Sequence, residues 1–309
     1  QGTGKFTLST CLEIIQEITK CNKNYAYEIF KKGVDCFWKP PVGNKGEKVV
    51  QEIKSIVPNA SLEVEKLDLT DMTSIKNFGQ NQKSKKIDIL LNNAGIMAVP
   101  FALTKDGFES QMGTNHLGHF LLTQILFETI SNSELARIVN VSSTAHRLGK
   151  LKTGDKSDLL MSENNYATWT AYGNSKLANL LFTNEMTRRL KQINSNVKVL
   201  SAHPGYSATN LQLVGPSLKK GFMAKIELAG SKFANKIFGQ SAASGALPSI
   251  AACNWADVQS GDFIGPDGPL QARGKPKKVN MSSLAKNSEL AINVWRTSEE
   301  LTGVKFLNG

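Results

Sequence analysis

Long apolar runs and cysteine are both scarce in this chain of 309 residues. No window of about 18 apolar residues occurs, so we expect no membrane span. The four cysteines are scattered without metal-ligand spacing, which predicts reduced thiols in a cytoplasmic protein and no metal site. No signal peptide is recognisable either.

Acidic residues are also in deficit, because 26 Asp and Glu stand against 37 Lys and Arg and give a formal net charge of +11. The lysines are spread along the chain, with small clusters at residues 83–86, 219–220 and 275–278. No interleaved aromatic residues and no nucleic-acid-binding motif accompany them. Solvated lysines on loops therefore explain the charge better than a nucleic-acid partner does. A positive surface also suits a phosphate-rich cofactor.

No stretch is rich enough in glycine or proline to act as a linker, and no internal repeat is visible. Short apolar runs alternate with longer helical patterns, which predicts a single α/β domain over residues 1–309, a doubly wound parallel sheet with helices on both faces. The predicted strands are residues 6–10, 34–38, 62–68, 87–92, 137–143 and 197–203. The predicted helices are residues 44–56, 72–82, 113–130, 170–192 and 242–253. An insertion at residues 211–236 serves either as a substrate lid or as an ordinary surface excursion.

Small or polar residues follow four of the predicted strands. They are Asp68, the run Asn92-Asn93-Ala94-Gly95, Ser143, and the run His203-Pro204-Gly205. Doubly wound sheets bind their ligands beyond the carboxyl ends of the strands. We therefore expect the functional site at this edge of the sheet.

Tyr172 and Lys176 lie four residues apart in a predicted helix, so they share one helix face. An ammonium group beside a phenol favours the phenolate and lowers its pKa. A tyrosine shifted in this way can exchange a proton with a hydroxyl or a carbonyl. Taken alone, the pair is more typical of a solvated surface helix, and its weight comes from the motifs around it.

Six motifs follow one another along the chain. They are Asp68-Leu69, Asn92-Asn93-Ala94-Gly95, Asn115, Ser143, Tyr172-x-x-x-Lys176, and Pro204-Gly205 followed by Thr209. In this order and spacing they resemble the short-chain dehydrogenase/reductase family, which implies a Rossmann-type fold. The segments at residues 114–120, 140–143, 175–179 and 261–303 look most like its retinol dehydrogenase-like branch.

The resemblance implies roles for these residues. Tyr172 is the expected general acid/base, and Lys176 is expected to lower its pKa and to hold the nicotinamide ribose. Ser143 is expected to hydrogen-bond the substrate carbonyl, and Asn115 to hold a water of a proton relay. The expected cofactor-binding residues are Asp68, Leu69, Asn92, Ala94, Gly95, Tyr172, Lys176, Pro204, Gly205 and Thr209. On local grounds alone, Asn92 and Asn93 also fit a turn at a strand end, and Thr209 also fits a helix N-cap.

The family's phosphate loop, T-G-x-x-x-G-x-G, has lost its glycines in the divergent N-terminal region, residues 1–45. Depending on the frame, the glycine positions hold Cys11, Ile15 and Glu17 or Lys20, Asn24 and Ala26. A Cβ at such positions blocks backbone contact with phosphate and strains any residue that needs a positive φ. Two hypotheses therefore stay open: an enzyme, or a catalytically silent binding or scaffold protein with impaired cofactor binding.

The enzyme hypothesis is an oxidoreductase that interconverts an alcohol and a carbonyl by hydride transfer, on a retinal-like, lipid-derived or xenobiotic substrate. The expected cofactor is NADP rather than NAD. The predicted strand 34–38 is followed by Lys39, which suits the 2′-phosphate of NADP, and not by an acidic residue that would bind the ribose of NAD. The expected partners are the small-molecule substrate and a second copy of the chain. Family members often pair through the helices that correspond to residues 113–130 and 170–192, which would give a homodimer.

Overall fold

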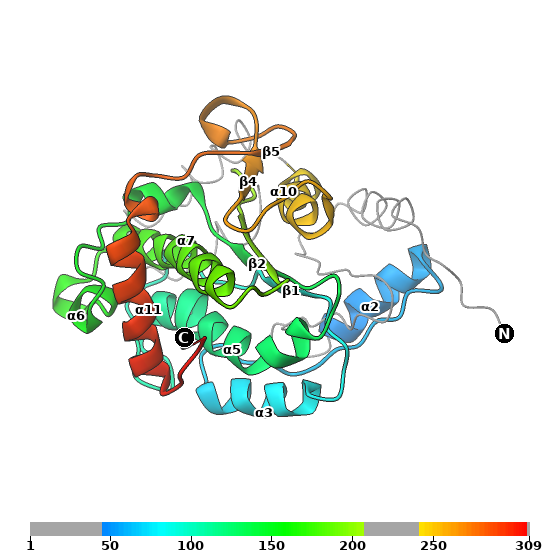
Figure 1. Cartoon of the computed structure of the whole chain (residues 1–309), viewed down its shortest axis with the longest axis horizontal. Coiled ribbons are helices and arrows are strands. Elements are labelled where there is room, and N and C mark those ends of the chain that lie inside the picture. Colours follow the sequence, from blue (N-terminus) through cyan, green and yellow to red (C-terminus); the bar gives the residue numbers. More distant parts are fainter. Residues whose placement is uncertain (1–44, 207–240, 308–309) are drawn as a thin grey trace, which may run out of the picture.

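The computed structural model of the chain describes residues 45–206 and 241–307, which are built around a five-stranded sheet (Figure 1). The strands lie in chain order as β1 (Ile89–Asn92), β2 (Arg137–Val141), β3 (Lys198–Ala202), β4 (Phe263–Pro266) and β5 (Pro276–Lys278). The first four run parallel, and β5 pairs antiparallel with β4. The predicted α/β fold with a parallel sheet is confirmed.

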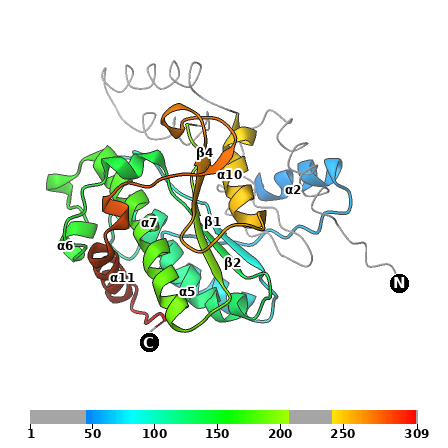
Figure 2. The same cartoon turned by 45° about the horizontal axis from the view of Figure 1, so that its top comes forward.

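Helices cover both faces of this sheet. α5 (Gly118–Ser131) and α7 (Thr168–Gln192) pack on one face, and α10 (Ala242–Asn254) packs on the other (Figure 2). α3 (Met72–Gln82) packs against α5, and α11 (Ser288–Thr302) packs against α7. The other α-helices of the described residues are α2 (Lys45–Ile56), α4 (Ser110–Met112) and α6 (Lys156–Leu159). None of the helices described is long and apolar enough to cross a bilayer.

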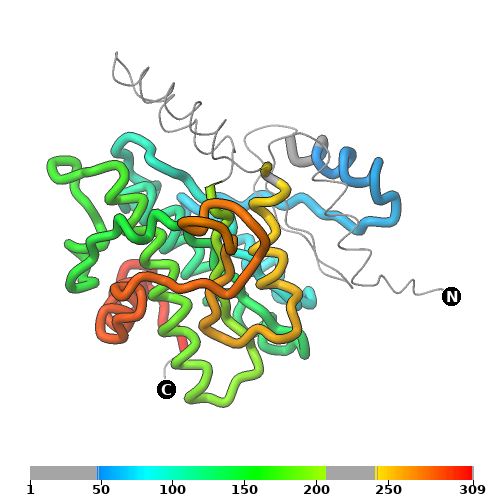
Figure 3. Tube along the Cα trace, turned by 90° about the horizontal axis from the view of Figure 1, so that it is seen from above, coloured from blue at the N-terminus to red at the C-terminus, as the bar shows by residue number. Residues whose placement is uncertain are grey.

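The C-terminal helix α11, red in Figure 3, packs along α7. Its Trp295 is buried with ring centroids 5.2 Å from Phe120 and 5.6 Å from Phe182. A polar bond adds to this packing, since Nε2 of His116 lies 2.8 Å from the Ser298 hydroxyl. Residues of both α5 and α7, the helices expected to pair in a homodimer, thus contact the chain's own C-terminal helix.

A buried polar network crosses the middle strands. Asn92 at the end of β1 lies opposite Asn140 of β2, and its amide donates to Asn140 Oδ1 at 2.8 Å. Asn140 donates to the Thr183 hydroxyl on α7 at 2.9 Å, and Ser201 of β3 donates to the same hydroxyl at 2.8 Å. These bonds satisfy polar groups that would be costly to bury alone, and they tie α7 to the two central strands.

Most predicted elements lie within a few residues of the observed ones, but one strand was wrong. Residues 62–68 form no strand with any described segment. An extended segment becomes a strand only when a neighbour pairs with it, and two of the other predicted strands, residues 6–10 and 34–38, lie outside the described residues. The predicted helix at residues 113–130 instead comprises a π-helical turn (Gly113–Leu117) and α5, and the short α4 precedes it.

Candidate active site

The four predicted catalytic residues lie together where β1 and β2 meet α7. Tyr172 and Lys176 are both buried, at 4% exposure each. The Lys176 amine lies 5.9 Å from the centroid of the Tyr172 ring and donates to the Val141 carbonyl, the last of β2, at 3.1 Å. The Ser142 hydroxyl donates to the Lys176 carbonyl at 2.7 Å. The end of β2 is thereby bonded directly to the helix turn that carries the lysine.

Two glycines bring Ser143 to Tyr172. Ser143 caps the 3-10 helix Thr144–Leu148, accepting a hydrogen bond from Ala145 N at 3.1 Å. This helix touches α7 so closely that a Cβ on Gly173 would lie 2.8 Å from Gly149 N and 2.9 Å from Ala145 O. Only a residue without a side chain allows the two backbones to approach in this way.

Asn115 is held in the π-helical turn, a local irregularity that is frequent at functional sites. Its amide exchanges two hydrogen bonds with the backbone of Ile96, at 2.8 and 2.9 Å. It also donates to the Ser175 hydroxyl at 2.9 Å, and Ser175 donates to the Tyr172 carbonyl at 2.8 Å. Sequence reasoning missed Ser175, although its position three residues after Tyr172 on one helix face could have indicated it.

Gly95 lies against both the Asn115 side chain and the Lys176 amine. A Cβ at this position would lie 2.9 Å from Asn115 Oδ1 and 3.5 Å from Lys176 Nζ. The Asn92 side chain, in contrast, is buried, and its amide nitrogen donates to the Thr123 hydroxyl and to Asn140 Oδ1. Ala94 is half-buried and packs against the hydrophobic core.

Burial shifts the pKa values of the tyrosine and the lysine in opposite directions. It raises the pKa of Tyr172 to about 12, an effect that interaction with the Ser143 side chain partly offsets. Burial also lowers the pKa of Lys176 to about 8. The expectation that Lys176 lowers the pKa of Tyr172 is thus wrong for this structure, because desolvation of the phenol outweighs an amine that stands off from the ring.

Two further predicted cofactor residues, Asp68 and Leu69, lie at and just after the end of the segment 62–68, which forms no strand with any described segment. The Asp68 carboxylate accepts bonds from the Thr70 amide and hydroxyl, at 3.0 and 2.7 Å. Leu69 is buried, and its carbonyl would lie 2.7 Å from a Cβ on Gly118.

The Pro204-Gly205 turn follows β3. Gly205 has φ +68° and donates through its amide to His203 Nδ1 at 3.1 Å. A Cβ at Gly205 would collide with the Ala272 carbonyl oxygen. Glycine at this position therefore allows the turn to pack tightly against the segment between β4 and β5. Thr209, the insertion 211–236 and residues 1–44 of the divergent region lie outside the described residues.

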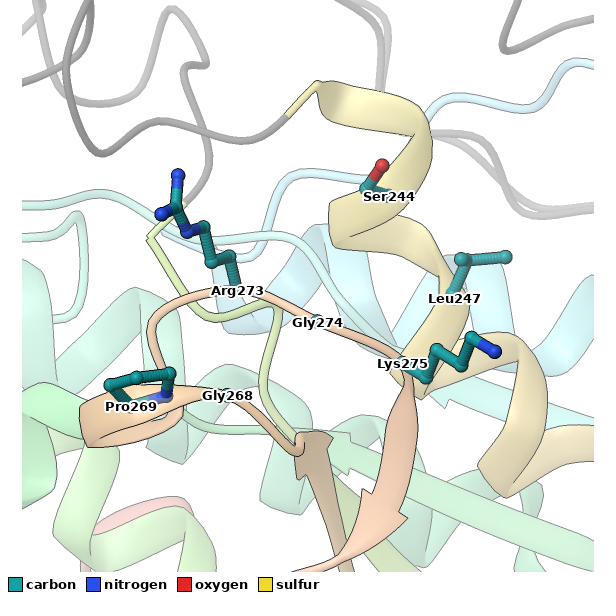
Figure 4. Close-up of a pocket in the computed structure, with 7 residues that line it drawn as sticks. All are labelled: Ser244, Leu247, Gly268, Pro269, Arg273, Gly274 and Lys275. Carbon is teal, nitrogen blue, oxygen red and sulfur yellow. The ribbon is translucent and has the colours of Figure 1, made fainter.

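A separate cavity of about 580 Å³ opens between α10 and the loop that joins β4 to β5 (Figure 4). It is lined by Ser244, Leu247, Gly268, Pro269, Arg273, Gly274 and Lys275. None of the four converging residues lines it, so this cavity is distinct from the place where Tyr172 lies.

Comparison with known proteins supplies a family context for this geometry. The short chain dehydrogenase family profile matches residues 22–153. Retinol dehydrogenase 12 of Mus musculus is 35% identical over 292 residues, which cover 93% of this chain and 84% of the relative. Retinol dehydrogenase 11 of Homo sapiens is 43% identical over 189 residues, which cover 60% of this chain and 58% of the relative.

Solved structures share the fold. The crystal structure of an uncharacterized protein from Mycobacterium Paratuberculosis has a TM-score of 0.68 and 36% identity, covering 89% of this chain and 85% of that one. The NADPH-bound carbonyl reductase from chicken fatty liver has a TM-score of 0.50 and 20% identity, covering 85% and 92% of the two chains. At that identity, the second match speaks for the fold alone.

Proposed function

Because the chain belongs to the short-chain dehydrogenase/reductase family, in its retinol dehydrogenase-like branch, we propose that it is an NADP-dependent oxidoreductase that interconverts an alcohol and a carbonyl. Membership itself indicates alcohol–carbonyl oxidoreduction with a nicotinamide cofactor. The observation that carries the proposal is the convergence of Asn115, Ser143, Tyr172 and Lys176 at the carboxyl ends of adjacent parallel strands.

In the proposed mechanism Tyr172 exchanges a proton with the substrate oxygen. A phenol with a pKa of about 12 keeps its proton at neutral pH, which suits donation to a carbonyl that is being reduced. The Ser143 hydroxyl, beside the phenol, donates a hydrogen bond to the same substrate oxygen. Lys176, with a pKa of about 8, can return a proton toward the phenol, and Asn115 holds the water that connects this amine to solvent.

The residues present fit the nicotinamide end of a cofactor. Of the three protons on the Lys176 ammonium, one is donated to Val141 O, which leaves two for ribose hydroxyls. The bare Cα of Gly95 keeps open the space beside this amine that a Cβ would enter. When bound, the nicotinamide supplies or accepts the hydride. The backbone of residues 92–95, Asp68, Leu69 and the Pro204-Gly205 turn would hold the rest.

The finer points of the proposal rest on sequence and on relatives. The preference for NADP rests on Lys39, outside the described residues. A retinal-like aldehyde is the first substrate to try, because the relatives that cover most of this chain carry the name retinol dehydrogenase. Lipid-derived and xenobiotic carbonyls are the next.

NADPH consumption with a panel of aldehydes and ketones tests this function, with Tyr172→Phe as the matched variant. Removing one hydroxyl from a buried ring deletes the proton donor and leaves the ring packing, so turnover should fall by about 10²–10⁴ while the thermal midpoint stays near wild type. Turnover that survives in Tyr172→Phe contradicts the assigned mechanism.

Because the glycines of the phosphate loop are missing, the alternative of a catalytically silent protein also needs a test. Titration calorimetry with NADPH and NADH separates the two. Binding of NADPH with saturable heat supports the enzyme, and the absence of heat with both nucleotides supports a silent binding or scaffold protein.

A further inference from the structure

Gln111 of α4 is fully buried, and its side chain joins two segments that flank the site. Its Oε1 accepts a hydrogen bond from Ala98 N at 2.8 Å. Its Nε2 donates to the Tyr166 hydroxyl at 2.7 Å and to the Thr168 carbonyl at 3.0 Å. Both ends of the amide are therefore engaged, one toward the segment after β1 and the other toward the start of α7.

The link to α7 reaches the turn that carries Tyr172. Thr168 is the first residue of this helix, and in a regular α-helix its carbonyl also accepts the Tyr172 amide. The N-cap residue, Ala167, provides no side-chain cap. The Gln111 amide does not replace this cap, because it donates to a carbonyl whereas the first turn of a helix leaves N–H groups unpaired. It does bond the first residue of α7 to α4.

The link to the segment after β1 reaches Asn115. Ala98 has φ +51°, a conformation that a non-glycine residue adopts only when its surroundings hold it. Gln111 holds its amide, and the Tyr166 hydroxyl donates to the neighbouring Val99 carbonyl at 2.8 Å. Two residues before Ala98, Ile96 makes the paired bonds that fix the Asn115 side chain.

We propose that Gln111 is a positioning residue that sets the placement of Tyr172 relative to Asn115. The inference rests on the proposed function of that site. Gln111 touches none of the reacting groups, so it acts on catalysis only through Thr168 and the segment 96–99. Its loss should lower turnover more than it weakens substrate binding.

The test compares Gln111→Met with Gln82→Met. Both variants replace a fully buried glutamine by an unbranched side chain of similar length, but Gln82 is the last residue of α3 and donates to Glu65. Gln111→Met should lower kcat by about tenfold and change KM by less than about twofold. Gln82→Met should lose stability without this loss of kcat. A kcat for Gln111→Met within about twofold of wild type overturns the inference.

Hydrogen–deuterium exchange gives a readout that does not need activity. Gln111→Met should speed exchange in peptides spanning residues 168–176 and leave residues 177–192 unchanged, whereas Gln82→Met should change neither. Gln111→Glu keeps the acceptor for Ala98 but loses the donor to Thr168, and should give the same pattern if the methionine variant does not fold. An inactive wild type would refute the proposed function, while unchanged exchange at residues 168–176 would refute the role of Gln111.

Discussion

Tyr172 and Lys176 are buried side by side, and burial favours the neutral form of each side chain. The pKa of Tyr172 rises to about 12 and that of Lys176 falls to about 8 from 10.5. A charged amine is therefore costly in the folded chain at neutral pH, although it serves the proposed chemistry. Such a cost at a catalytic residue is a common exchange of stability for activity.

Lys176→Met should therefore abolish turnover and yet stabilise the fold near neutral pH. Below about 8, Lys176 is protonated in both states, and between about 8 and 10.5 only the unfolded chain keeps the proton. Wild-type stability consequently rises with pH across this window, by roughly 3 kcal/mol at most. Urea unfolding at several pH values measures this. The free energy of unfolding of Lys176→Met should exceed that of the wild type near neutral pH, and the difference should shrink as the pH rises from about 8 to 10.5. An advantage that stays constant would contradict the assigned burial cost.

At the scale of elements, the contact between α7 and the 3-10 helix Thr144–Leu148 determines how close Ser143 comes to Tyr172. This contact depends on backbone touching backbone at Gly173 and Gly149. A flexible side chain can relieve a clash by changing its rotamer, but backbone atoms cannot. An atom added at this contact must therefore displace one of the two helices.

Gly173→Ala should therefore separate the two elements, destabilise the fold by about 1–3 kcal/mol and lower kcat. Gly79→Ala is the matched control, since its Cβ would meet the Ile125 side chain far from the site rather than backbone. Thermal unfolding and NADPH consumption on both variants check this. Equal loss of activity in the two variants would show that the effect is only a general loss of stability.

At the scale of the whole molecule, α11 packs along α7, and its Trp295 also contacts Phe120 of α5. Trp295 fills the space between Phe120 and Phe182, and Arg189 of α7 lies 4.6 Å over its ring. A surface already covered in this way offers little further apolar area for association.

We therefore predict that any pairing of this chain leaves α5 and α7 out of the contact. Sedimentation over a range of concentrations gives the oligomeric state, and hydrogen–deuterium exchange at the same concentrations locates the contact. Peptides of α5 and α7 should exchange at one rate throughout. If these peptides become more protected as the concentration rises, α5 and α7 form the dimer interface and the prediction is wrong.

Local pattern was sufficient where a neighbour three or four residues away decides the outcome. The bounds of α3 match the predicted helix 72–82, and the Tyr172–Lys176 pair shares a helix face as its spacing required. The same reasoning failed for residues 62–68, because a strand is defined by a partner elsewhere in the chain. It also failed to foresee that the Asn92 side chain would be enclosed among Thr123 and Asn140 rather than left at the strand end.

By itself the sequence determined the chemistry available here: the order of the motifs, the alternation of strands and helices, and the phenol and amine on one helix face. Only the tertiary structure decided the direction in which the pKa values of these groups shift, the bonds from Gln111 to the start of α7, and the packing of α11 on α7. Each of these depends on atoms far apart in the chain, as His116 and Ser298 are. Burial is a sum over all neighbours in space, whereas a sequence pattern records only the neighbours along the chain.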